Sequence, residues 1–148
     1  MNAGPASDPA ELLARTTLHV RRGPFSLAAW QTNQLSAVLA GLLRARLEHT
    51  FVITDELEVT AFVPADALNA FPAPLRAEHG WCLVTLDTVM DWDVVGVLAA
   101  VTGTLAAAGV PLGAVTAFSR DHLLLTADHL DAALKALAEL CAGIHMVD

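Results

Sequence analysis

The amino-acid sequence predicts an α+β protein built from two ferredoxin-like βαββαβ units packed side by side, the first of them degenerate. Three observations support this prediction. The second half of the chain alternates apolar stretches of strand and helix length in the order β-α-β-β-α, with a short apolar stretch at its end. The first half follows a rougher version of that order. A fragment of similar sequence also recurs 62 positions apart, at residues 65–68 and 127–130.

Length and composition are those of a packed globular protein. The chain has 148 residues, of which 55% are hydrophobic and 16% charged, so it can bury a core without disulfides or metals. Its net charge of −8 and its scattered basic residues argue against nucleic acid, because a phosphate backbone requires a clustered basic surface. We therefore expect no nucleic-acid partner.

The first unit is expected at residues 15–76, after an N-terminal tail at residues 1–14. Within the tail, residues 8–13 favour one helical turn capped by Ser7 or Asp8. Residues 18–20 and 25–30 are typical of two short strands joined by a Gly23-Pro24 turn. Leucines and valines at spacings of three and four then predict a helix from residue 35 to about Arg44 or Arg46.

The rest of this unit is predicted as a strand pair and a short helix. Residues 51–53 and 57–63 favour strands around the polar corner at residues 54–56, and residues 64–68 begin the helix. A segment containing Pro72 and Pro74 links this part to the second half.

The second unit is expected at residues 77–148 and is more regular. Residues 81–86 are apolar on both faces, as in a strand covered on both sides. A helix at 93–108, strands at 110–118 and 122–125, and a helix at 128–142 capped by Gly143 follow. Residues 144–146 are expected to add a final strand.

Residues 94–118 carry no charge and are long enough to span a bilayer, which takes about 20 residues. Gly109 and Pro111 interrupt this run, and no basic residue flanks it, so we expect a buried helix and strand and no membrane span. The N-terminus resembles no secretion signal. Cys82 and Cys141 are isolated and favour reduced core thiols, which predicts a cytoplasmic protein.

The sequence contains none of the common catalytic or metal-binding motifs. Its six histidines show no metal-ligand spacing, its serines lack the glycine context of a nucleophile elbow, and no phosphate-binding glycine loop is present. We therefore expect no catalytic residues, no metal and no cofactor. An acidic corner at Asp55, Glu56 and Glu58 is compatible with a divalent cation or with simple solvation.

The segment before the predicted helix at 93–108 allows two interpretations. Asp91 and Asp93 could cap the helix, since carboxylates accept hydrogen bonds from its first N–H groups. Alternatively, residues 88–93 form the rim of a pocket, with helix N–H groups for a carboxylate and nearby acids for an ammonium group. Such a site suits a zwitterion, with Trp92 as an apolar wall.

Several segments resemble the ACT domain of small tandem-ACT proteins. They are residues 80–84, 92–98, 105–110 and 118–124, while residues 54–59 resemble a strand of the family's first domain. The resemblance is to aspartate-kinase-type ACT regions and to the eukaryotic cytosolic arginine sensor. It implies βαββαβ modules that bind amino acids at domain interfaces and control enzymes.

The resemblance also implies a ligand site, with the loop and helix start as pocket floor and Asp121 as partner of a cationic ligand group. The alternative is that these are ordinary strand and turn residues. Departures include Thr116-Ala117-Phe118 in place of a Ser-Thr-aromatic pattern. The implied ligand-binding residues are Met90, Asp91, Trp92, Val94, Gly96, Thr116, Phe118 and Asp121, with Thr54 and Glu56 from the first unit.

Together these features predict a non-catalytic, allosteric regulatory protein that senses an amino acid at the interface of ACT units. We expect a homodimer that acts on a regulated partner protein. The alternative is an ACT-fold interaction module that has lost ligand binding. A small enzyme is the third class, and it would require His122 and Asp121, or His79, to meet in a pocket.

Overall fold

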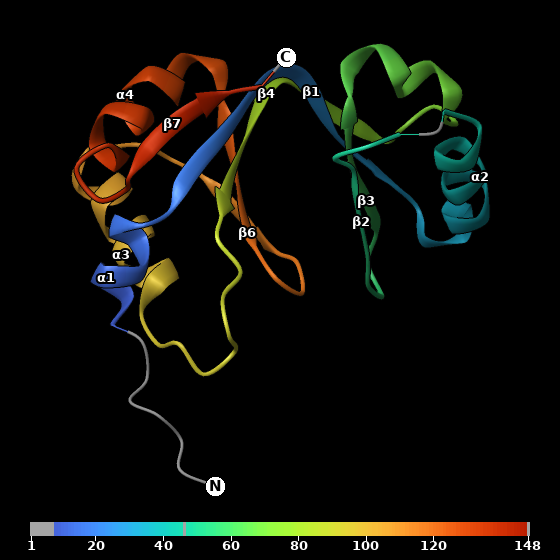
Figure 1. Ribbon diagram of the computed structural model, residues 1–148. Helices are drawn as coiled ribbons and strands as arrows, with labels where there is room; N and C mark the ends of the chain where they lie inside the picture. Colours follow the sequence, from blue (N-terminus) through green and yellow to red (C-terminus); the bar gives the residue numbers. More distant parts are fainter. Residues whose placement is uncertain (1–7, 46, 148) are drawn as a thin grey trace, which may run out of the picture. The chain divides into compact units, whose positions relative to one another are not determined.

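The computed structural model describes residues 8–45 and 47–147, and it has α+β architecture (Figure 1). The first half contains α1 (Pro9–Ala14), β1 (Thr17–Trp30), the 3₁₀ turn η1 (Thr32–Gln34), α2 (Leu35–Ala45), β2 (Phe51–Thr54), β3 (Val59–Pro64) and the 3₁₀ helix η2 (Ala65–Ala70). The second half contains β4 (Arg76–Asp87), α3 (Val97–Ala107), β5 (Gly113–Thr116), β6 (Asp121–Thr126), α4 (Ala127–Leu137) and β7 (Gly143–Met146).

The chain forms two compact units, one of which is inserted into the sequence of the other. The continuous unit is Gly23–Trp81, and the split unit combines the chain up to Arg22 with the chain from Cys82 onward. The boundaries fall inside β1 and β4, so each of these long strands contributes one half to each unit. Each unit has its own hydrophobic core.

The continuous unit has ferredoxin-like topology. Its elements follow the order β1-α2-β2-β3-η2-β4, and its strands pair in the order β2-β3-β1-β4. The six-residue 3₁₀ helix η2 occupies the place of the second helix, which makes this unit the degenerate one. Trp30 is buried in its core and donates its indole N–H to the carbonyl of Pro72 at 2.8 Å.

The split unit has the complete order β4-α3-β5-β6-α4-β7. The N-terminal half of β1 enters between β4 and β7, and it pairs in parallel with β7 so that His19 lies opposite His145. Helix α1 contacts α3 and buries Leu13 in the same core. The side chain of Asp8 caps α1 by accepting the N–H of Ala10 at 3.0 Å, as the sequence predicts.

The two units repeat each other at an offset of 62 residues. Helix α2 starts at Leu35 and α3 starts at Val97, and both have 11 residues. Strand β2 pairs with β3 from Phe51↔Phe62 to Thr54↔Val59, while β5 pairs with β6 from Gly113↔Leu124 to Thr116↔Asp121. Every one of these positions differs by 62, so the repeat that the sequence indicated extends to element lengths and strand register.

The compact units differ in extent from the predicted boundaries at 1–14, 15–76 and 77–148. Residues 9–14 form α1 within the split unit, and residues 17–22 pair there with β7. The assignment of residues 15–76 as a degenerate ACT unit stays a prediction. Ser7 and Arg46, named above as helix-end candidates, lie outside the described residues.

Two local predictions in the strands were wrong. Gly23-Pro24 does not turn the chain between two strands but lies within the single strand β1, where Gly23 has φ of +75° and precedes a cis peptide bond. Strand β5 covers only Gly113–Thr116, because the chain then leaves the sheet to form the corner closed by the Ala117 N–H to Arg120 carbonyl bond of 3.0 Å.

Two helix predictions also require correction. Helix α3 begins at Val97 after the N-cap Gly96, so Asp91 and Asp93 precede it without capping it. Helix α4 ends at Leu137, before the predicted end at residue 142, and Gly143 opens β7 instead of capping the helix. Among the described residues, none of the helices is long and apolar enough to cross a membrane.

We predict that Gly23→Ala lowers the free energy of unfolding by about 2 kcal/mol, because a left-handed conformation strains a residue with a Cβ atom. A Cβ atom there would also lie 2.6 Å from the backbone nitrogen of Phe25 and 2.7 Å from the carbonyl oxygen of Trp81. Urea denaturation measures the change.

The matched control is Gly103→Ala in α3, where an added Cβ meets nothing within 4 Å. Alanine improves helix propensity, so this variant should be more stable by about 0.5–1 kcal/mol. Equal losses in the two variants would contradict the assigned role of Gly23.

Candidate functional site

The split unit contains a cavity of about 240 Å³ between the start of α3 and the β5–β6 corner. This volume is slightly below the usual range for ligand pockets, about 300–1,000 Å³, and it suits a small ligand. The wall is formed by two short runs of chain, namely Met90, Asp91, Trp92, Val94 and residues 96–99 from the first run, and residues 116–121 from the second.

The first run approaches the cavity through a tight turn that ends at Gly96. The Val94 N–H donates to the carbonyl of Asp91 at 3.2 Å, and Gly96 takes φ of +99° as the N-cap of α3. No side chain caps this helix, so its first-turn N–H groups have no capping partner, and Val97, Leu98 and Ala99 of that turn line the cavity. Such N–H groups attract an anion, for example a carboxylate.

The second run contributes a buried carboxylate. Asp121 is only 9% exposed, and its Oδ1 accepts a hydrogen bond of 2.8 Å from the hydroxyl of Thr116. Cross-strand pairing of Thr116 with Asp121 fixes both residues at the corner. Within the described chain, no basic side chain forms an ion pair with Asp121. A buried carboxylate is costly unless a cation or further hydrogen bonds compensate its charge, so this wall favours a cationic ligand group.

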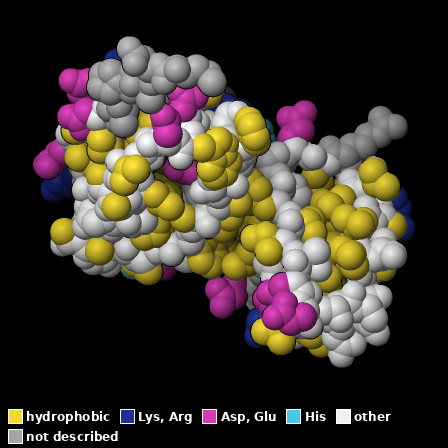
Figure 2. Space-filling view, turned by 90° about the horizontal axis from the view of Figure 1, so that it is seen from below, with side chains coloured by type: hydrophobic (Ala, Val, Ile, Leu, Met, Phe, Trp, Pro, Cys, Tyr) yellow, Lys and Arg dark blue, Asp and Glu magenta, His cyan; other side chains and the backbone are white. Residues whose placement is uncertain are grey.

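The two runs are joined where the Met90 N–H donates to the carbonyl of Ser119 at 3.1 Å. Trp92 and Phe118 meet edge to face at the rim, with ring centroids 6.1 Å apart, and both rings are largely exposed. Figure 2 shows apolar side chains gathered on the face seen from below, with acidic side chains among them. The rim thus combines an aromatic pair with the exposed acids Asp91 and Asp93.

The structure brings eight of the ten candidate residues together around this cavity. The other two, Thr54 and Glu56, lie at the β2–β3 corner of the continuous unit and do not line it. Thr54 is the counterpart of Thr116 at the 62-residue offset.

Sequence reasoning expected helix N–H groups near this loop but missed Arg120, Val97 and residues 98–99, all of which line the cavity. Arg120 belongs to the polar corner 119–121, in which the sequence analysis assigned only its neighbour Asp121 to ligand binding. The N–H groups of residues 97–99 could be assigned to the first turn only once the helix start was known, because a helix that starts at residue 93 would use them in internal hydrogen bonds.

The carboxylate of Asp55 accepts hydrogen bonds from the backbone of its own corner. Its Oδ1 accepts the N–H groups of Leu57 at 2.8 Å and Glu58 at 2.9 Å, and these bonds lower the pKa of the Asp55 carboxyl. Glu58 forms an ion pair with Arg76. Among the described residues, no group of three or more His, Cys, Asp or Glu side chains is arranged to hold a metal ion.

Comparison with known proteins shows what the second half of the chain is similar to. Residues 76–139 match the family model of the ACT domain, and this segment includes both runs that line the cavity. This part of the chain is therefore similar to an ACT domain, which agrees with the resemblance seen in the sequence. A comparison with curated protein sequences finds no match.

Solved structures share the fold over most of the chain. A protein from Agrobacterium tumefaciens is 20% identical, with a TM-score of 0.72 over 90% of this chain and 95% of the other. A protein of unknown function from Vibrio cholerae is 21% identical, with a TM-score of 0.66 over 88% and 94%. The ligand-free regulatory subunit of aspartate kinase from Thermus thermophilus is 16% identical, with a TM-score of 0.67 over 86% and 97%.

We predict that Thr116→Val lowers the free energy of unfolding by about 1–2 kcal/mol near pH 7, because the buried Asp121 carboxylate loses its hydroxyl donor. Thr116→Ser keeps the hydroxyl and should stay within about 0.5 kcal/mol of the wild type. Urea denaturation of the three proteins measures both changes. Equal stabilities of the valine and serine variants would show that this hydrogen bond contributes nothing.

Proposed function

We propose that this protein is a non-catalytic regulator that binds an amino acid in the cavity at the start of α3. The support comes from an acidic side chain and residues bearing hydrogen-bond donors, which line the same cavity. The cavity is lined by Asp121, which is buried, and, from the other run, by the first residues of α3, whose N–H groups no side chain caps. A free amino acid carries the complementary ammonium and carboxylate groups within a few bonds of each other.

The proposed binding mode follows from these groups. The ligand ammonium group lies against Asp121, and the ligand carboxylate accepts N–H bonds from residues 97–99. Met90, Val94 and Leu98 supply apolar surface for the ligand side chain. Trp92 and Phe118 stand at the rim, where they contact the part of the side chain that reaches the opening.

Regulation follows because the ligand would contact two separate runs of chain at once. One run leads from β4 into α3, and the other joins β5 to β6. A ligand that binds both shifts the protein toward the arrangement in which they are close. We propose that a partner protein senses this shift, as expected of an allosteric subunit, and that the protein acts as a homodimer in the cytoplasm.

A thermal-shift screen against the twenty amino acids tests this function. Binding to the folded state alone raises its stability by about 2.7 kcal/mol at a ligand concentration one hundred times Kd. We predict a shift with at least one amino acid. Asp121→Asn should weaken that binding at least tenfold, about 1.4 kcal/mol, since it removes the charge that faces the ammonium group.

The control is Glu139→Gln, which removes one negative charge from an exposed position that does not line the cavity. This variant should bind like the wild type. If no amino acid shifts the melting temperature, or if Asp121→Asn binds as tightly as wild type, the proposed site is wrong.

The second candidate is a protein-interaction module that does not bind a ligand. The observation in its favour is the exposure of the apolar side chains Trp92 and Phe118, which meet at the rim, and of Val89 and Val95 nearby in the sequence, each more than 70% exposed. Clusters of this kind often mark binding surfaces. A negative amino-acid screen together with loss of partner binding in Trp92→Ala would favour this candidate.

A further inference from the structure

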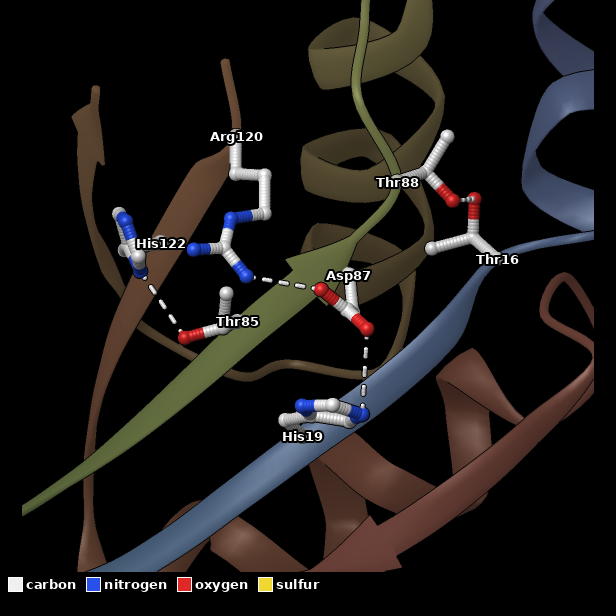
Figure 3. A network of polar contacts seen from close by, with 7 residues as sticks. All are labelled: Thr16, His19, Thr85, Asp87, Thr88, Arg120 and His122. Carbon is white, nitrogen blue, oxygen red and sulfur yellow. Dashed lines mark hydrogen bonds and ion pairs between the residues drawn. The ribbon is translucent and has the colours of Figure 1, made fainter. Parts of the chain in front are cut away.

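The inference concerns Arg120, the basic residue in the cavity wall. Arg120 immediately precedes Asp121 in the sequence, yet its guanidinium is engaged elsewhere: Nη1 donates to Oδ1 of Asp87 at 2.8 Å (Figure 3). Asp87 ends β4, and Asp121 begins β6. The arginine thus has a carboxylate next to it in the sequence, but it pairs with Asp87, which does not line the cavity.

Asp87 is itself held in position from a third strand. Its Oδ2 lies 3.4 Å from Nε2 of His19 in β1, as Figure 3 shows. The ring of His19 meets His145 of β7 edge to face, with centroids 5.1 Å apart. These contacts keep the Asp87 carboxylate beside the corner that carries Arg120.

Strand geometry separates the two neighbours at the corner. Successive side chains of an extended chain point to opposite faces, so Asp121 turns toward Thr116 and the cavity while Arg120 turns toward Asp87. An arginine side chain is long and flexible, however, and without Asp87 its charge would be drawn toward the nearest remaining carboxylate. Asp121 would then be partly neutralised.

We propose that Asp87 is a specificity-determining positioning residue, which holds Arg120 away from Asp121 and so keeps the cavity selective for a ligand rich in positive charge. This inference rests on the proposed amino-acid site. It adds that a residue outside the cavity, which does not touch the ligand, influences which ligand side-chain charge the cavity prefers. His19 supports Asp87 in this role.

Isothermal titration with three amino acids of different charge tests the proposal. The probes are L-arginine, L-leucine and L-aspartate, and the quantity compared is the ratio of their affinities. Asp87→Asn should lower the arginine-to-leucine ratio by about twofold to fivefold, the range expected for one partly exposed ion pair. It should also raise the aspartate-to-leucine ratio, because the released guanidinium attracts the extra carboxylate.

The double variant Asp87→Asn/Arg120→Gln separates this role from a merely structural one. If Asp87 acts by holding Arg120, the double variant regains the ratios of the single variant Arg120→Gln. If Asp87 only supports the fold, Asp87→Asn lowers the affinity for all three ligands by the same factor. The additional change Arg120→Gln then does not restore the affinities. Glu139→Gln, with the same change in charge, should leave the ratios unchanged, and urea denaturation verifies that each variant is folded.

The outcomes distinguish this proposal from the proposed function. Wild-type binding with ratios that Asp87→Asn does not alter overturns the role of Asp87 and leaves the amino-acid site intact. Wild-type binding to none of the three probes also overturns the charge selectivity. If the screen of twenty amino acids is negative as well, the proposed function fails with it.

Discussion

The two long strands β1 and β4 constrain the rest of the fold, because each of them serves two hydrophobic cores. The first half of β1 buries Leu18 and Val20 in the split unit, and its second half buries Ala28 and Trp30 in the continuous unit. A change in the register of either strand would therefore disturb both cores. Gly23 stands at the change of unit, in a conformation that other residues adopt only with strain.

The cavity depends on this framework through the end of β4. After Asp87 the chain leaves the sheet, passes Met90 and enters α3 at Gly96, while the sheet neighbour β6 places Asp121 opposite the helix start. The residues that bear the polar groups of the site are thus positioned by strand pairing and by a helix start. Only the rim, with Trp92 and Phe118, consists of exposed side chains free to adapt to a ligand.

The order of strands and helices was predictable because apolar spacing reports directly which residues are buried. Eight of the ten candidate residues line one cavity, since they lie in two short runs of chain, and their role in ligand binding stays a prediction. The start of α3 was not predictable, because aspartate, present at positions 91 and 93, is a more favourable N-cap residue than the actual cap Gly96. The pairing of Arg120 with Asp87 joins positions 33 residues apart, and sequence spacing carries no signal for it.

The 62-residue repeat has a consequence for how many ligand molecules one chain can hold. The counterpart of Asp121 in the continuous unit is Val59, a fully buried apolar residue at the same place in the paired strands. The counterpart of Thr116 is still a threonine, Thr54, but it has no carboxylate opposite it. The two units thus share the same strand pairing, but only the split unit has a carboxylate at this position. The proposed stoichiometry is therefore one amino acid per chain.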